Sequence, residues 1–289
     1  MSDQLIRILS HDGQLRAMAA TTTNLVENLR LRHGTDPTAT VALGRLASGT
    51  ALLGSLLKDD QRLGLMIEAN GPLRKLHAET DAAGHLRATI KHPLSGLPPT
   101  SDNFPVAEAV GKAGFLHVIK DLGLKDTYRS MVQLYTSEIA EDLAYYLTSS
   151  EQVPSSVALG VTLATDGSVA AAGGLMVQAL PDCGEDTLVA LEEMLKQLTP
   201  VTTLLKQGQS PLRILSDLLG AGNFAVKSDI PLVFRCTCSL RQIVSMLQGL
   251  DRAEREHLAG REEPTEVTCE YCREIYRFQP GELAALHRD

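Results

Sequence analysis

Two cysteine pairs near the C-terminus constrain this chain more than any other feature. Cys236-Thr237-Cys238 and Cys269-Glu270-Tyr271-Cys272 hold four of its five cysteines. Each pair places two sulfur atoms on one side of a tight turn, so together they can supply four thiolates to a tetrahedral Zn²⁺ ion. Closing the loop between the pairs costs about 3 kcal/mol, whereas a structural zinc ion returns about 10–16 kcal/mol. We therefore expect residues 231–289 to form a small domain that binds one Zn²⁺ through these four cysteines.

Other interpretations of the cysteines are weaker. Four buried or disulfide-bonded cysteines are the plain alternative, but two close pairs in an intracellular chain are more typical of a metal site. His257 lies between the pairs, where it would compete with a coordination sphere that four thiolates already complete. Cys183 precedes a predicted helix, whose N-terminus would lower a thiol pKa. We assign Cys183 no role.

The composition indicates a folded protein rather than a disordered or membrane-spanning one. The chain has 289 residues, of which 44% are hydrophobic and 21% charged. Its first residues carry charges where a secretory signal would be apolar, so we expect a cytoplasmic protein. The longest apolar stretch, residues 39–57, contains Arg45 and three glycines, which favours a buried helix over a membrane span.

Charge and motifs argue against several functions. The net charge of −8 has the wrong sign for a general nucleic-acid binder, so we expect no nucleic-acid partner. A zinc-ribbon nucleic-acid-binding protein remains the alternative. The chain lacks the glycine motifs that bind nucleotide phosphates, and its CxxC pair has no thioredoxin-like βαβ context. We therefore predict a protein that is not an enzyme and does not use ATP.

The pattern of residues 1–180 predicts an α+β domain of mixed sheets and helices. Asp12-Gly13 and Asp166-Gly167 each separate two alternating apolar segments, which indicates two β-hairpins. Helices are expected over residues 24–32, over 37–58 and after the capping residue Ser137. Three short strand-like runs between residues 62 and 91 suggest an antiparallel meander.

The rest of the chain predicts a helical connector followed by the zinc-binding domain. Residues 185–198 and 210–219 are helix-prone, so we expect a connector over 181–230. Between the cysteine pairs, Ser239 and Asp251 are predicted N-caps of two short helices. A β-ribbon after Val267 carries the second pair, and Pro280 begins a last helix.

Several motifs resemble a known family over essentially the whole chain. Together with the cysteine spacing, they are Ala42-Leu43-Gly44-Arg45, Gly71-Pro72-Leu73, Val118-Ile119-Lys120-Asp121-Leu122-Gly123 and Ser137-Glu138-Ile139-Ala140-Glu141-Asp142-Leu143-Ala144-Tyr145-Tyr146-Leu147. In this order they resemble the thirty-three-kilodalton heat-shock protein family of bacterial redox-regulated holdase chaperones. The cysteines alone would fit many zinc modules, whereas the combination is specific.

The resemblance implies a function and a switch. A reduced, zinc-bound monomer would be inactive, and oxidants with unfolding stress would give an active homodimer that binds unfolded client proteins. Cys236, Cys238, Cys269 and Cys272 would be both zinc ligands and redox-active residues. Their oxidation to Cys236–Cys238 and Cys269–Cys272 disulfides would release zinc and unfold the domain that zinc stabilises.

Overall fold

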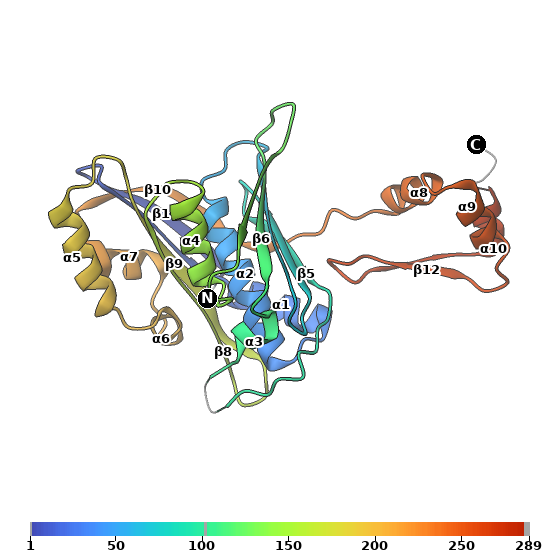
Figure 1. Ribbon diagram of the computed structural model, residues 1–289, viewed down its shortest axis with the longest axis horizontal. Helices are drawn as coiled ribbons and strands as arrows, with labels where there is room; N and C mark the ends of the chain where they lie inside the picture. Colours follow the sequence, from blue (N-terminus) through green and yellow to red (C-terminus); the bar gives the residue numbers. More distant parts are fainter. Residues whose placement is uncertain (1, 101–102, 286–289) are drawn as a thin grey trace. The chain divides into compact units, whose positions relative to one another are not determined.

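The chain forms two compact units. The computed structural model describes residues 2–100 and 103–285. Its units are Met1–Phe234 and Arg235–Asp289 (Figure 1). Each has its own hydrophobic core. Both mix sheets with helices, which confirms the α+β prediction. The division into an α+β domain (1–180), a connector (181–230) and a zinc-binding domain (231–289) stays a prediction.

A five-stranded antiparallel sheet in the first unit brings together distant parts of the chain. Its order is β10-β1-β2-β9-β8. The strands are β1 (Gln4–Ser10), β2 (Leu15–Thr21), β8 (Ser155–Leu163), β9 (Val169–Ala179) and β10 (Phe224–Pro231). Both predicted hairpins are present, and Gly13 and Gly167 adopt the positive φ angles, 75° and 81°, that such turns require.

A six-stranded sheet forms the other layer of this unit, in the order β11-β5-β4-β3-β6-β7. The strands are β3 (Arg62–Ala69), β4 (Lys75–Asp81), β5 (His85–Ile90), β6 (Gly114–Asp121), β7 (Tyr128–Gln133) and β11 (Val233–Phe234). The predicted meander is β3 to β5, which pair antiparallel in sequence order. Strand β11 joins β5 in parallel.

Helix α2 (Pro37–Gly54) packs against both sheets and is buried along nearly its whole length. Asp36 caps it by accepting a hydrogen bond from the Ala39 N–H, and Pro37 occupies its first turn. Gly44 allows close packing, because a Cβ there would lie 2.7 Å from both Val26 and Val161. The helix ends at Gly54 rather than at the predicted residue 58. Among the described residues, none of the helices combines the length and apolar character of a membrane span.

The first unit has three further helices near α2, and the start of one of them differs from the prediction. They are α1 (Thr23–His33), α3 (Val106–Val110) and α4 (Ala140–Ser149). Ser137 is not the N-cap of α4, as predicted, but donates its hydroxyl to the Gly111 carbonyl. The Asp142 carboxylate instead accepts hydrogen bonds from the backbone N–H groups of four preceding residues, Tyr135, Thr136, Ser137 and Ile139.

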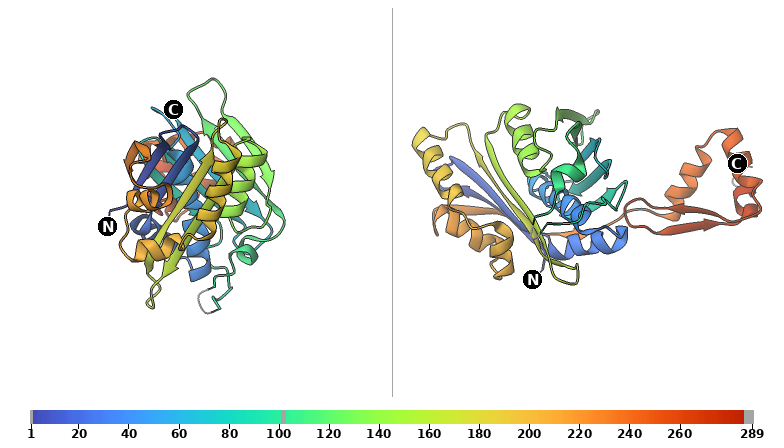
Figure 2. Two further views of the ribbon diagram at one scale, coloured as in Figure 1. Left: turned by 90° about the vertical axis from the view of Figure 1, so that its left-hand side faces the viewer. Right: turned by 60° about the horizontal axis from the view of Figure 1, so that its bottom comes forward.

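Three helices of the predicted connector cover one face of the five-stranded sheet. They are α5 (Glu185–Lys196), α6 (Val201–Lys206) and α7 (Pro211–Leu219) (Figure 2). Leu205, Leu215 and Leu218 pack with the strands in a core separate from the one around α2. The predicted helical connector was given an end at residue 230, but its last part, Phe224–Pro231, forms edge strand β10. Pairing with β1 decides its conformation.

The second unit is small and contains the predicted elements. They are α8 (Leu240–Gln248), α9 (Arg252–Ala259), β12 (Thr265–Thr268), β13 (Ile275–Phe278) and α10 (Pro280–Ala285). Ser239 and Asp251 cap α8 and α9 as expected. Among its described residues, Leu247, Phe278 and Leu283 form the buried part of its core. So small a core gives limited stability without a further constraint.

Candidate zinc centre

The two cysteine pairs occupy two different kinds of backbone in the second unit. Cys236 and Cys238 lie in the extended segment before α8. Cys269 and Cys272 lie in the turn that joins β12 to β13. Within this turn the Cys269 N–H donates to the Glu274 carbonyl, and the Arg273 N–H donates to the Cys269 carbonyl. The turn therefore holds both sulfur atoms of the second pair at one end of the ribbon.

The four sulfur atoms form one compact cluster. All four Sγ atoms lie within 4.8 Å of one another. The Cys236 and Cys269 Sγ atoms are 3.7 Å apart, and those of Cys238 and Cys272 are 3.3 Å apart. A tetrahedral zinc ion with Zn–S bonds of about 2.3 Å requires S–S distances of about 3.8 Å. All five cysteines are free thiols, so the cluster has both the spacing and the chemistry of a four-thiolate zinc site.

The cluster does not distribute its protons evenly. Burial raises the pKa of Cys236, but hydrogen bonds from the Cys238 backbone and from the other three thiols outweigh it and lower the pKa to about 7. Burial raises the pKa of both Cys238 and Cys272. The Cys236 sulfur thus ionises readily, while Cys238 and Cys272 hold their protons. A divalent cation would remove this conflict, because a coordinating thiol is deprotonated outright.

Tyr276 is a further residue of the centre that the sequence did not single out. Its hydroxyl donates a hydrogen bond to Cys238 Sγ at 3.2 Å. This bond is the main reason that the pKa of Tyr276 is raised. Alternation after the second pair indicates a strand here, but no local pattern places the hydroxyl beside Cys238, because the two residues are 38 positions apart in the chain. Such outer contacts orient metal ligands.

The other candidate ligands lie outside the cluster. Among the described residues, the four cysteines form the one group of His, Cys, Asp or Glu side chains close enough to hold a metal ion. His257, in α9, is not part of it. Cys183 packs against the core under α5–α7, where burial raises the pKa of its thiol rather than lowering it. The structure therefore gives Cys183 none of the activation that a helix N-terminus would provide.

Comparisons with known proteins agree over nearly the whole chain. Residues 3–279 match the family described as Hsp33 protein. A 33 kDa chaperonin of Syntrophotalea carbinolica is 58% identical over 287 residues, which are 99% of each chain. Another from Staphylococcus carnosus is 38% identical, over 98% of this chain and 97% of that one.

A solved structure agrees as well. The crystal structure of the 33 kDa chaperonin (heat shock protein 33 homolog) from Thermotoga maritima matches with a TM-score of 0.91 at 33% identity. The match covers 100% of this chain and 98% of that one. Because the sequence match and the shared fold extend over nearly the whole chain, and the four cysteines are clustered, this chain belongs to the Hsp33 family of chaperones.

Proposed function

We propose that this chaperone is a redox-regulated, ATP-independent holdase. It binds unfolding client proteins in the cytoplasm during oxidative stress and is inactive while its thiols are reduced. The observation that carries the proposal is the cluster of four free thiols within 4.8 Å of one another, in a unit with few other stabilising contacts. A four-thiolate centre without an open position has a structural role and no catalytic one.

In this proposal the cysteines hold one zinc ion in the reduced protein. When bound, the ion keeps all four sulfur atoms as thiolates and stabilises the fold of the second unit. Oxidation of each pair of thiolates to a disulfide removes two electrons, and one hydrogen peroxide molecule accepts them together with two protons from solvent and becomes two waters. The disulfides Cys236–Cys238 and Cys269–Cys272 no longer supply thiolate ligands, so the small unit loses its main constraint.

The connector is the proposed client-binding segment. Its apolar side chains are packed against the five-stranded sheet, so clients gain access only when the helices leave that face. The first cysteine follows strand β11 closely, and β10 directly precedes β11. Unfolding of the second unit therefore frees the chain next to an edge strand, which promotes separation of β10 and then of α7. The exposed surface binds clients or a second copy of the chain.

A client-aggregation assay with parallel zinc release tests the proposal. The reduced protein should release no zinc and protect poorly, whereas the peroxide-treated protein should release one zinc ion per chain, protect the client and elute as a dimer. Cys183→Ser is the matched control, because it removes a thiol outside the cluster and should switch normally. Equal protection by the reduced and oxidised protein, without zinc release, would show the proposal to be wrong.

A further inference from the structure

Two arginines lie side by side on the five-stranded sheet, on the face opposite the connector helices. Arg7 is in β1 and Arg16 in β2. In the register of these strands, Arg7 faces Met18 and Arg16 faces Leu9, so the two arginines are diagonal neighbours on one face. Diagonal neighbours are within reach of each other when their side chains are long.

Both guanidinium groups are held by neutral partners. Arg7 Nη2 donates to Ser228 Oγ of β10 at 2.9 Å, and its buried Nε has no hydrogen-bond partner. Arg16 Nε donates to Gln178 Oε1 of β9 at 3.0 Å. The Gln178 side chain, in a residue only 1% exposed, in turn donates to Ser155 Oγ of β8. Polar side chains from all five strands thus support two positive charges.

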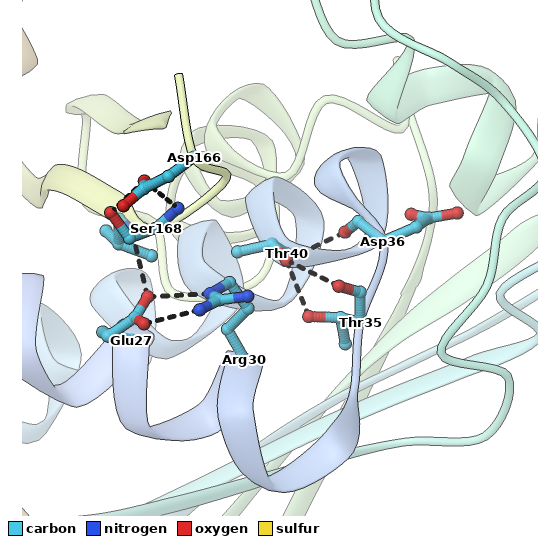
Figure 3. A network of polar contacts seen from close by, with 8 residues as sticks. Glu27, Arg30, Thr35, Asp36, Thr40, Asp166 and Ser168 are labelled. Carbon is cyan, nitrogen blue, oxygen red and sulfur yellow. Dashed lines mark hydrogen bonds and ion pairs between the residues drawn. The ribbon is translucent and has the colours of Figure 1, made fainter. Parts of the chain in front are cut away.

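The missing element is a carboxylate. Three other arginines with similarly covered side chains, Arg30, Arg45 and Arg87, each form an ion pair with a glutamate, as Arg30 does with Glu27 (Figure 3). Within residues 2–100 and 103–285, neither Arg7 nor Arg16 has an acidic partner at ion-pair distance. A partly buried cation without a counter-charge is unfavourable, and two adjacent ones are more so.

The electrostatics of the pair agree with this geometry. Burial lowers the pKa of Arg7. Burial, and then the charge of Arg7, lower the pKa of Arg16. Both shifts mean that the protein environment disfavours the charged guanidinium groups. An anion bound between the two arginines would favour the charged forms and raise both pKa values.

We propose that Arg7 and Arg16 form a binding site for a small oxyanion, a phosphate group or a carboxylate. Two planar guanidinium groups offer several N–H donors in the geometry that such anions accept. Arg7 Nε is a donor in need of an acceptor, and Ser228, which accepts from Arg7, retains its own O–H to donate. Because Ser228 belongs to β10, bound anion also joins this edge strand to β1 and β2.

Thermal unfolding of the reduced full-length protein tests the site, with inorganic phosphate and acetate as probes against chloride at equal ionic strength. At a concentration ten times its Kd, a bound anion should raise the Tm by about 3 °C. It should also slow hydrogen exchange of the β10 amides. A response to phosphate alone identifies phosphate groups as the ligand class, and a response to acetate alone identifies carboxylates. No response to either anion would overturn the proposal.

Variants test whether the anion-dependent rise in Tm comes from Arg7 and Arg16. The double variant R7Q/R16Q should lose it, whereas R62Q/R129Q should keep it, because that control removes two exposed arginines from strands of the other sheet. If R7Q/R16Q fails to fold, R7K/R16K keeps the charges without the forked donors and should bind phosphate at least tenfold more weakly. Undiminished binding in either Arg7/Arg16 variant would refute the site.

Discussion

The proposed client-binding role of the connector can be tested by shortening one buried leucine of its helix α7. Leu215 in α7 is 0% exposed and packs in the core between the connector helices and the five-stranded sheet. Leu215→Ala removes a fully buried side chain, which costs about 3 kcal/mol where the surroundings do not collapse into the space. The substitution destabilises only the state in which α7 is packed on the sheet (the docked state), because the side chain is solvated once α7 leaves the sheet. The undocked fraction should therefore rise about 100-fold.

The assay compares reduced, zinc-loaded proteins, so that the cysteine switch plays no part. Leu215→Ala should suppress aggregation of a thermally unfolding client at temperatures at which the wild-type protein does not. Hydrogen exchange of the α7 amides should accelerate by a similar factor of about 100. Leu212→Ala is the matched control on the same helix, since Leu212 is 39% exposed and its loss should change stability by less than about 0.5 kcal/mol.

One result would refute the reasoning directly. If the α7 amides of Leu215→Ala exchange faster, as expected, but the reduced variant protects the client no better than Leu212→Ala does, the connector leucines are not the client-binding surface. If the α7 amides exchanged faster in both variants, burial of the side chain would not be what holds α7 on the sheet. The zinc content of each variant, measured in parallel, must stay at one ion per chain for the comparison to hold.

Four further outcomes are expected. Chelation of zinc should remove hydrogen-exchange protection from residues 235–285 and weaken it in β10 and α7, while the rest of the first unit keeps its own; protection unchanged in both units would contradict a structural zinc. Oxidation should yield Cys236–Cys238 and Cys269–Cys272, since cross-links must keep a long loop closed once the metal has gone; peptide mapping that finds mainly cross-linked pairs would count against this. A chain ending at Phe234, which retains β10 and β11, should protect clients when reduced; a folded but inactive product would exclude control by the second unit. Burial raises the pKa of Glu151, but hydrogen bonds from Lys120 and Tyr146 lower it overall, so its stabilising effect is present above the unfolded pKa of about 4.3 and is lost as the pH falls through the lower folded value. Glu151→Gln should therefore flatten the acid side of a Tm–pH curve, and an unchanged curve would contradict this.

The structure also changes one argument about disulfide pairing. If proximity decided the partners, each cysteine would pair with its neighbour two or three positions away. In the cluster, however, sulfur atoms of different pairs are as near as 3.3 Å, so proximity in the folded site does not select partners. Selection then depends on the loop entropy of the chain after zinc has left, which the peptide mapping measures.

Local chemistry explains where the sequence-based prediction succeeded. The Asp-Gly turns fix two hairpins, because glycine adopts the positive φ angle at little cost. Ser239 and Asp251 mark helix starts through side-chain hydrogen bonds that span three residues. Each of these signals acts within a few positions of the chain, so neighbouring residues contain the whole interaction.

Where the prediction failed, the deciding partner was distant in sequence. Strand β10 alternates weakly and follows two helices, so its segment was assigned to a helical connector, but its hydrogen bonds go to β1. Ser137 was chosen as a helix cap because of its residue type. Asp142 took the role of binding the preceding backbone because the chain turns back before α4.

The sequence by itself determined most of the elements and the α+β class, because their signals are local. It also identified the four cysteines that can bind one metal ion, because spacing along the chain limits which sulfur atoms can meet. Only the tertiary structure decided that the connector leucines are buried, that Tyr276 reaches a sulfur atom and that Arg7 lies beside Arg16 without a carboxylate. These contacts depend on strand register and on which face of a sheet is covered. Both are set by hydrogen bonds and packing between segments far apart in the chain, which no local pattern records.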